Sequence, residues 1–390
     1  MKKNFKTTLL IAFSALFALN ISSCKKSKPD SIVEPANNDA VKIAVINQFL
    51  NHTVAPTYAK LAMYADELVN DLKTLKSDMS QANVNKAAQS FLEARHWWEM
   101  SEAFLFGAAS DFGIDPHIDS WPLDEDAFNN LMSSPSMLAA LDTEDGDIVA
   151  GEQLGNALLG FHGIEYILFR EGQPRPVVEI TNNYMIYAVA VAGDLRNRCF
   201  QLEVSWVGDD APATHVALMK ELEFNITVNS GDFSYGENMQ NAGKAGSTYP
   251  SLTNALQAII EGSIGIADEV GTSKIGKPHT GEDPTYVESP YSQKSIIDFY
   301  DNITSVKNSY MGGNEGERDE SKSLHAIMQQ VDAQLDMRVV EAIDKALAQI
   351  NGMAAPFVSN YTDPSASEAM EACQDLSDVL SEAKTAIQKF

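Results

Sequence analysis

Apolar residues recur at intervals of three and four along most of the chain, and this spacing predicts α-helices nearly throughout. No segment shows a sustained alternation of apolar and polar residues, so no β-strand is predicted. We therefore predict an all-α fold, with helices over about 41–75, 84–106, 154–169, 183–206, 252–270, 296–310, 323–350 and 365–390.

The region between residues 207 and 251 differs in character, because it contains Pro212, Pro250 and several glycines. Such residues interrupt helices and are typical of connecting segments. We predict a domain boundary there, with an N-terminal helical bundle over 41–230 and a C-terminal one over 231–390. The short connections between the predicted helices favour a four-helix-bundle-like arrangement in each domain.

The first 24 residues have the order of an export signal. Three lysines precede an apolar run from Leu9 to Leu19, and small residues then lead to Cys24. This order predicts a lipoprotein signal peptide over 1–23, a lipidated Cys24 and a polar tether over 24–40. We expect a protein of the cell envelope, at the outer membrane, that contacts the membrane only through its lipid.

Net charge and cysteine use narrow the possible partners. The 390 residues carry a net charge of -26, which argues against nucleic acid, since phosphate contacts need clustered lysine and arginine. Cys199 and Cys373 both lie on apolar helical stripes. We expect them to be buried as small apolar side chains and to form neither a disulfide nor a metal site.

A histidine and a glutamate share one face of the helix predicted over 154–169. His162 and Glu165 are three residues apart, and Glu165 falls within the apolar stripe. A buried carboxylate costs several kcal/mol, as an order of magnitude, unless it is paired or binds a metal. The pair suits two metal ligands, or a base with its orienting acid, but it equally suits a structural contact. The His-Glu-x-x-His pattern of zinc peptidases does not occur in the chain.

Further polar residues on the preceding segments are candidate companions. Arg95, Trp98 and Glu102 share one line of the helix over 84–106, and Asp119 and Trp121 follow in an acidic loop. An interior ion pair explains Arg95 and Glu102 without any function. Alternatively Glu102 faces the same cavity as His162 and Glu165. Two carboxylates and one imidazole would then bind a hard or borderline cation, and we name these three residues as metal ligands.

The segment before the helix at Ile296 carries a helix-start signal. Ser289 is predicted as the N-cap, with Pro290 at the first helical position and Ser292 following. Capping alone accounts for these residues. A helix N-terminus that faces a cavity also attracts anions, so Ser289 and Ser292 are further candidate site residues.

Taken together, these segments resemble the imelysin family. The resemblance rests on residues 98–106, 119–122, the Gly-x-His-x-x-Glu run over 160–165, the glycine-rich stretch 262–271 and residues 287–298. It implies an all-helical fold of two domains and exported proteins that are often tied to iron uptake or regulated by iron. Part of the family carries a peptidase label. The family motif falls on Gly160, His162 and Glu165 of this chain, with Glu102, Asp119, Trp121, Ser289 and Ser292 as companions.

The sequence thus favours a lipid-anchored binding protein with a role in iron uptake. Its ligand is expected to be iron, an iron chelate or a partner protein of the envelope, and the metal is iron or zinc. The alternative is a metallopeptidase that uses His162 and Glu165. We name no catalytic residue, because two ligands on one helix are fewer than the three that a catalytic zinc usually has.

Overall fold

The computed structural model describes residues 38–390. Its chain begins with one long helical stretch made of α1 (Asp39–Phe49), the π-helical segment η1 (Leu50–Val54) and α2 (Ala55–Ser77). The predicted helix over 41–75 is therefore present, but it contains a wide turn. Pro56 is the second residue after that turn. A proline has no N–H to donate inside a regular helix, and the wide turn accommodates this lack.

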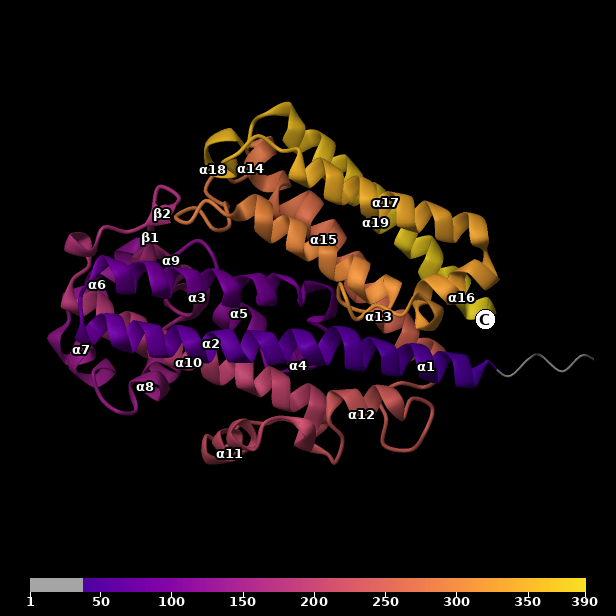
Figure 1. Cartoon of the computed structure of the whole chain (residues 1–390), viewed down its shortest axis with the longest axis horizontal. Helices are drawn as coiled ribbons and strands as arrows, with labels where there is room; N and C mark the ends of the chain where they lie inside the picture. The colour runs from indigo at the N-terminus through magenta and orange to yellow at the C-terminus, as the bar shows by residue number, and fades with distance from the viewer. Residues whose placement is uncertain (1–37) are drawn as a thin grey trace, which may run out of the picture. The chain divides into compact units, whose positions relative to one another are not determined.

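The N-terminal half packs around α2. The helices α3 (Gln81–Glu99) and α10 (Asn182–Val207) lie along α2, and α9 (Gly160–Leu168) contacts both α3 and α10 (Figure 1). Shorter helices complete this half: α4 (Ala108–Asp111), α5 (Ile114–Ile118), α6 (Glu125–Met132), α7 (Pro135–Leu141), α8 (Gly146–Gln153), α11 (Ala213–Glu221) and α12 (Tyr235–Gln240).

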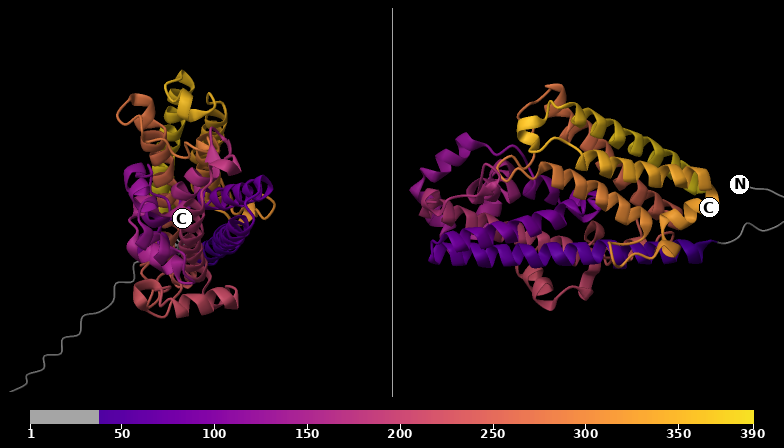
Figure 2. Two further views of the ribbon diagram at one scale, coloured as in Figure 1. Left: turned by 90° about the vertical axis from the view of Figure 1, so that its left-hand side faces the viewer. Right: turned by 45° about the horizontal axis from the view of Figure 1, so that its top comes forward.

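The C-terminal half contains a ring of four helices. Each of α13 (Leu252–Glu269), α15 (Ser295–Met311), α17 (Ala333–Asn351) and α19 (Pro364–Ala386) contacts two of the others, as in a four-helix bundle (Figures 1 and 2). Short helices connect them: α14 (Gly276–Thr280), α16 (Leu324–Val331) and α18 (Phe357–Asn360). A second π-helical segment, η7 (Val270–Lys274), follows α13 directly.

The only strands in residues 38–390 form one minimal hairpin. Strand β1 (Phe169–Arg170) pairs antiparallel with β2 (Gln173–Pro174). Both turn residues, Glu171 and Gly172, have positive φ angles, which suits the twist of a two-residue hairpin. The predicted all-α class is confirmed, because each strand of this hairpin has only two residues and the rest of the fold is built from helices.

Three helix starts differ from the sequence prediction. The helix that carries His162 begins at Gly160 and not near Leu154, because Leu159 is extended. The helix predicted over 323–350 is broken at Asp332, whose side chain caps α17. The last helix is capped by Asp363, whereas Ser365 was predicted within a capping box. In the first two cases a local side chain or backbone conformation interrupts the helix although the apolar spacing continues. The helix predicted over 84–106 also ends early, at Glu99 of α3, so Glu102 lies beyond it.

Buried apolar residues extend from Val45 to Ile387 in one cluster that includes helices of both halves. Cys199 and Cys373 are free and buried in it, as predicted. The division into domains at residue 230 stays a prediction. The signal peptide, Cys24 and most of the tether lie outside the described residues. Among residues 38–390, every helix is too short or too polar to cross a bilayer.

Candidate functional site

Glycines bring the segments of the site close together. At Gly160 the φ angle is +70°, and a Cβ there would lie 1.8 Å from the backbone oxygen of Ile118. A Cβ at Gly163 would lie 2.0 Å from the hydroxyl of Tyr187 on α10. The turn that starts α9 can therefore approach these segments only because both positions lack a side chain.

A third glycine, Gly262, does the same between the two halves. A Cβ at this position of α13 would lie 2.2 Å from the backbone oxygen of Ala103. Helix α13 thereby packs directly on the short helix η2 (Glu102–Phe104), which carries Glu102. Gly262, the first glycine of the stretch 262–271, thus has a packing role beside the site.

Arg95 of α3 stands at the centre of a buried ionic network. Its side chain is 2% exposed, and its guanidinium forms ion pairs with Glu99, Asp119 and Glu288. Its Nε lies 3.8 Å from Asp298 Oδ2 on α15. Glu288 and Asp298 come from the C-terminal half, so one guanidinium holds carboxylates of both halves.

His162 is fixed by two carboxylates, one on each ring nitrogen. Its Nε2 lies 3.0 Å from Asp119 Oδ1, and its Nδ1 lies 3.5 Å from Glu165 Oε2. Trp98 Nε1 donates to the other oxygen of Asp119 at 2.7 Å. The half-buried ring of Trp121 lies against His162, with ring centroids 5.8 Å apart. Asp119 therefore orients the side chains of both His162 and Trp98.

Glu165 is fully buried and receives two backbone hydrogen bonds from the C-terminal half. The amides of Tyr291 and Ser292 donate to its Oε1 at 3.2 and 2.7 Å. Its Oε2 is buried and has no hydrogen-bond partner among the described residues. The hydroxyl of Ser292 is likewise buried without a partner. Glu165 is thus held firmly through Oε1, while Oε2 faces His162 Nδ1 at 3.5 Å without a hydrogen bond.

The predicted capping role of Ser289 is wrong. Helix α15 begins at Ser295, and Ser289 lies outside it with a φ angle of +49°. Its hydroxyl donates to Asp298 Oδ2 at 2.5 Å. The turn 289–294 instead directs the amides of Tyr291 and Ser292 toward Glu165. A Ser-Pro pair alone does not reveal this, because both arrangements begin with the same two residues.

Lys274, at the end of η7, is a second buried cation. Its side chain is 1% exposed, and its Nζ lies 3.2 Å from Glu288, 3.5 Å from Glu99 and 3.7 Å from Glu102. The predicted candidate Glu102 therefore contacts Lys274. Asp119 has a carboxylate oxygen close to Glu102 and Glu99 and also close to His162. Sequence reasoning missed Lys274, because Thr272 and Ser273 precede it and a second lysine follows at Lys277, so nothing in the local pattern marks it as buried.

The site holds more buried acids than bases. The carboxyl groups of Glu99, Glu102, Asp119, Glu165, Glu288 and Asp298 are matched by only Arg95, Lys274 and His162. Burial raises the pKa values of Glu99 and Glu102 well above the usual range. Burial also raises the pKa of Asp298 to about 7. An additional cation would therefore suit this cluster electrostatically.

Two of these groups respond to their partners more than to burial. Burial raises the pKa of Asp119, but the charge of Arg95 outweighs this effect and holds the pKa well below its usual range. Burial lowers the pKa of His162, but its interactions with Asp119 and Glu165 outweigh that effect and raise it to about 9. Asp119 and His162 are therefore a charged pair in the absence of a ligand.

Several sets of these atoms can reach one metal ion. Ligand atoms of Asp119, His162 and Glu288 lie within 4.8 Å of one another, as do those of Glu99, Glu102 and Asp119. In both sets Asp119 already accepts from Arg95. The pair of His162 Nδ1 and Glu165 Oε2 is less occupied by other groups, because Glu165 Oε2 has no hydrogen-bond partner. Its spacing of 3.5 Å matches the roughly 3–3.5 Å between neighbouring ligands of one zinc-like ion.

Comparison with known proteins gives a consistent result. Residues 54–383 match the family model described as imelysin, peptidase M75. The iron-regulated protein A of Synechococcus elongatus is 28% identical over 268 residues, which are 68% of this chain. The match spans 64% of that relative's own length.

Solved structures also resemble this one. A crystal structure from Parabacteroides distasonis, described as that of an iron-regulated protein A precursor, has a TM-score of 0.77 and 28% identity, and the match covers 92% of this chain and 97% of that one. An imelysin-like protein from Psychrobacter arcticum has a TM-score of 0.57 and 13% identity over 89% of this chain and 93% of that one. The second likeness concerns the fold alone.

Proposed function

This chain belongs to the imelysin family, and we propose that it is an exported protein of the cell envelope that binds iron through His162 and Glu165. The observation that carries the proposal is the pair of ligand atoms in α9. His162 Nδ1 and Glu165 Oε2 lie 3.5 Å apart, and the glutamate oxygen has no hydrogen-bond partner.

The surroundings of this pair suit a metal-binding histidine. Metal-bound histidines commonly donate their second ring N–H to a carboxylate, which fixes the ring and its tautomer. Asp119 is in the right position for this, at 3.0 Å from His162 Nε2. The metal would take the place of the proton on Nδ1. The unpartnered hydroxyl of Ser292 offers an additional oxygen ligand for a hard cation such as iron.

A binding role fits this site better than proteolysis. A catalytic zinc needs an open coordination position that the substrate reaches. His162 is 2% exposed and Glu165 is 0% exposed, so an extended polypeptide has no direct access to them. The metallopeptidase alternative is supported by the triplet of Asp119, His162 and Glu288, which offers three ligand atoms. Arg95, however, already forms ion pairs with two of the three.

The iron assignment also draws on relatives, since two of them are named for their regulation by iron. An iron chelate and a partner protein of the envelope are the other ligands to test. The deep burial of His162 favours the bare ion over both.

Metal analysis of the purified protein tests the proposal. The protein is stripped with a chelator, equilibrated with iron(II) or with zinc under anaerobic conditions, and dialysed. We expect about one bound ion per chain, with binding weakened at least about tenfold in Glu165→Gln and in His162→Ala. Glu144→Gln, a change at an exposed glutamate outside the site, is the matched control.

Equal metal content in the parent protein and in both variants would contradict the proposal. Cleavage of unfolded polypeptides that requires added zinc, and that both variants lack, would establish the peptidase alternative. All three proteins are first compared by thermal melting, so that a loss of metal is not confused with a loss of fold.

The envelope location rests on the predicted signal peptide and is tested separately. We expect the native protein to carry lipid on Cys24, which intact mass measurement detects. Cys24→Ser should appear in the soluble fraction, whereas the parent protein should require detergent. A Cys24→Ser protein that still requires detergent would contradict the lipid anchor.

A further inference from the structure

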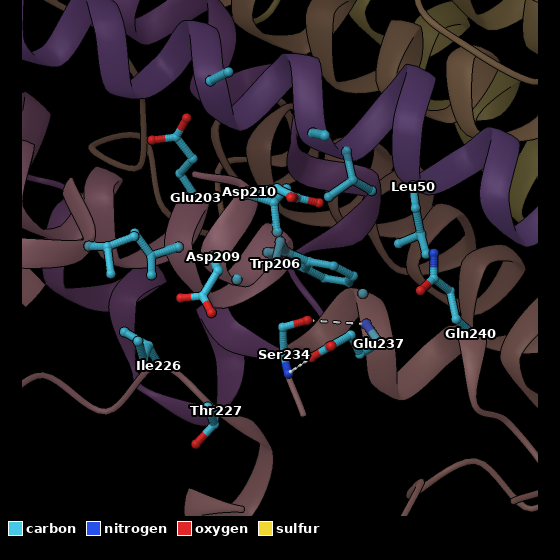
Figure 3. A pocket seen from close by; sticks show the side chains of 18 of the residues that line it. Leu50, Glu203, Trp206, Asp209, Asp210, Ile226, Thr227, Ser234, Glu237 and Gln240 are labelled. Carbon is cyan, nitrogen blue, oxygen red and sulfur yellow. Dashed lines mark hydrogen bonds between the residues drawn. The ribbon is translucent and has the colours of Figure 1, made fainter. Parts of the chain in front are cut away.

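A groove of about 700 Å³ lies on the N-terminal half and shares no lining residue with the His162 site. It is bordered by η1, α2, α10, α11, α12 and the segment before α12, and Figure 3 shows it from close by. Its volume falls within the range of small-molecule sites, roughly 300–1,000 Å³. The groove can therefore hold a compact organic molecule.

The lining of this groove is apolar at its base. The π-helical turn η1 contributes Leu50 and Val54, and α10 contributes Val204 and Trp206. Wide turns of this kind occur often at functional sites. On α2 the lining residue Ala59 is small, which leaves the space open. A ligand bound here would therefore bury an apolar portion against aliphatic and aromatic side chains.

The rim of the groove is strongly acidic. The lining contains one cationic side chain, Lys220, and five carboxylates, those of Glu203, Asp209, Asp210, Asp232 and Glu237. Figure 3 labels four of these carboxylates: Glu203, Asp209, Asp210 and Glu237. Glu237 is engaged as part of the capping box of α12. Within residues 38–390, the side chains of Asp209, Asp210 and Asp232 form no hydrogen bond or ion pair. Their negative charge is thus available to a ligand.

Glu203 sets this groove apart from an ordinary acidic surface. Its side chain is 5% exposed although it lines the groove. One oxygen, Oε2, lies 2.5 Å from His215 Nδ1, whose ring stacks on Phe200. The other oxygen has no hydrogen-bond partner in the described structure. A deeply set carboxylate with a free oxygen is a fitting acceptor for a charged N–H group.

We propose that this groove, the Glu203 groove, binds a small organic cation, that is, an amine or guanidinium group carried on an apolar body. The negative charge of its carboxylates would repel an anion. The apolar base distinguishes it from a site for an inorganic dication, which prefers oxygen ligands on all sides.

Calorimetric titration with 2-phenylethylammonium tests this proposal, with 2-phenylethanol as the neutral analogue of the same shape. We expect the purified protein to bind the ammonium compound at millimolar concentration or below, and to bind the alcohol at least about tenfold more weakly. Asp209→Asn/Asp210→Asn and Glu203→Gln should each weaken binding of the cation by roughly tenfold. Ala59→Trp should abolish it by filling the groove.

The matched control is Glu144→Gln/Asp145→Asn, which removes two adjacent exposed charges elsewhere and should leave binding unchanged. The proposal is overturned if the cation does not bind, if the alcohol binds as well as the cation, or if the control weakens binding as much as the groove variants do. Binding of calcium alone, abolished by Asp209→Asn/Asp210→Asn, would also overturn it. Glu203→Gln alone is judged only if its melting temperature matches that of the parent protein.

Discussion

The chain gathers excess carboxylates in two regions, and burial is what separates them. In the His162 site, Glu99, Glu165 and Glu288 are 0% exposed, and each is held by residues from elsewhere in the fold. In the Glu203 groove, Asp209 and Asp210 are exposed and unpaired. Changes in the first region should therefore cost stability as well as binding, whereas changes at Asp209 and Asp210 in the second should alter binding alone.

The two regions also differ in whether they contain residues of one half of the chain or of both. The His162 site contains residues of α3 and α9 together with the turn 289–294 and η7, so its ion pairs also join the halves. The lining of the groove comes from residues 50–240 only. A loss of contact between the halves should therefore disrupt the first region and leave the second intact.

The largest expected effect follows from Arg95→Met. The substitution keeps most of the side-chain volume but leaves Asp119, Glu99 and Glu288 without their shared cation. Removing one partner of a buried ionic network typically costs roughly 3–5 kcal/mol. Chemical denaturation of the parent protein and the variant measures this loss.

Arg338→Met is the matched control, because Arg338 pairs with Glu382 at the surface and exposed pairs contribute little. Equal stability of Arg95→Met and Arg338→Met would show that the buried network does not stabilise the fold.

Gly160→Ala is expected to have the next largest effect. The added Cβ would meet the Ile118 oxygen, and alanine disfavours the φ angle of +70°. Backbone strain of this kind costs roughly 1–3 kcal/mol before the clash is counted. Gly155→Ala is the control, since Gly155 has a negative φ angle and open space around it. Similar melting temperatures for the two variants would contradict the described start of α9.

The smallest effect on stability is expected for Asp209→Asn/Asp210→Asn in the groove. Both side chains are exposed and unpaired, so their removal should leave the melting temperature nearly unchanged. Because the chain is strongly acidic, the reduced repulsion favours a slight rise in melting temperature over a fall. A marked fall in melting temperature would mean that the groove is part of the stabilising structure and would remove the contrast between the two regions.

Sequence patterns predicted the helices well because apolar spacing reports which face is buried. The same spacing located Glu165 inside and put His162 beside it. It misplaced the start of their helix, because a positive φ angle at Gly160 leaves no trace in the pattern of apolar residues. Periodicity therefore finds the face of a helix more reliably than its end.

The partners of His162 and Glu165 were harder to predict. Asp119 was a candidate on its own merits, but its contacts with both Arg95 and His162 depend on how a loop folds back. Lys274 and Glu288 are far from Glu99 along the chain, and neither belongs to a spacing motif. Such long-range ion pairs are fixed by the packing of the two halves, which no local pattern encodes.

The most direct test of the iron site is anomalous diffraction from crystals grown anaerobically with iron(II). The account predicts a peak at the iron edge within roughly 2.0–2.3 Å of both His162 Nδ1 and Glu165 Oε2, with Asp119 retained on His162 Nε2. The same crystals of Glu165→Gln should lack the peak. No peak at this pair in the parent protein, or a peak only among Asp209, Asp210 and Asp232, would contradict the account.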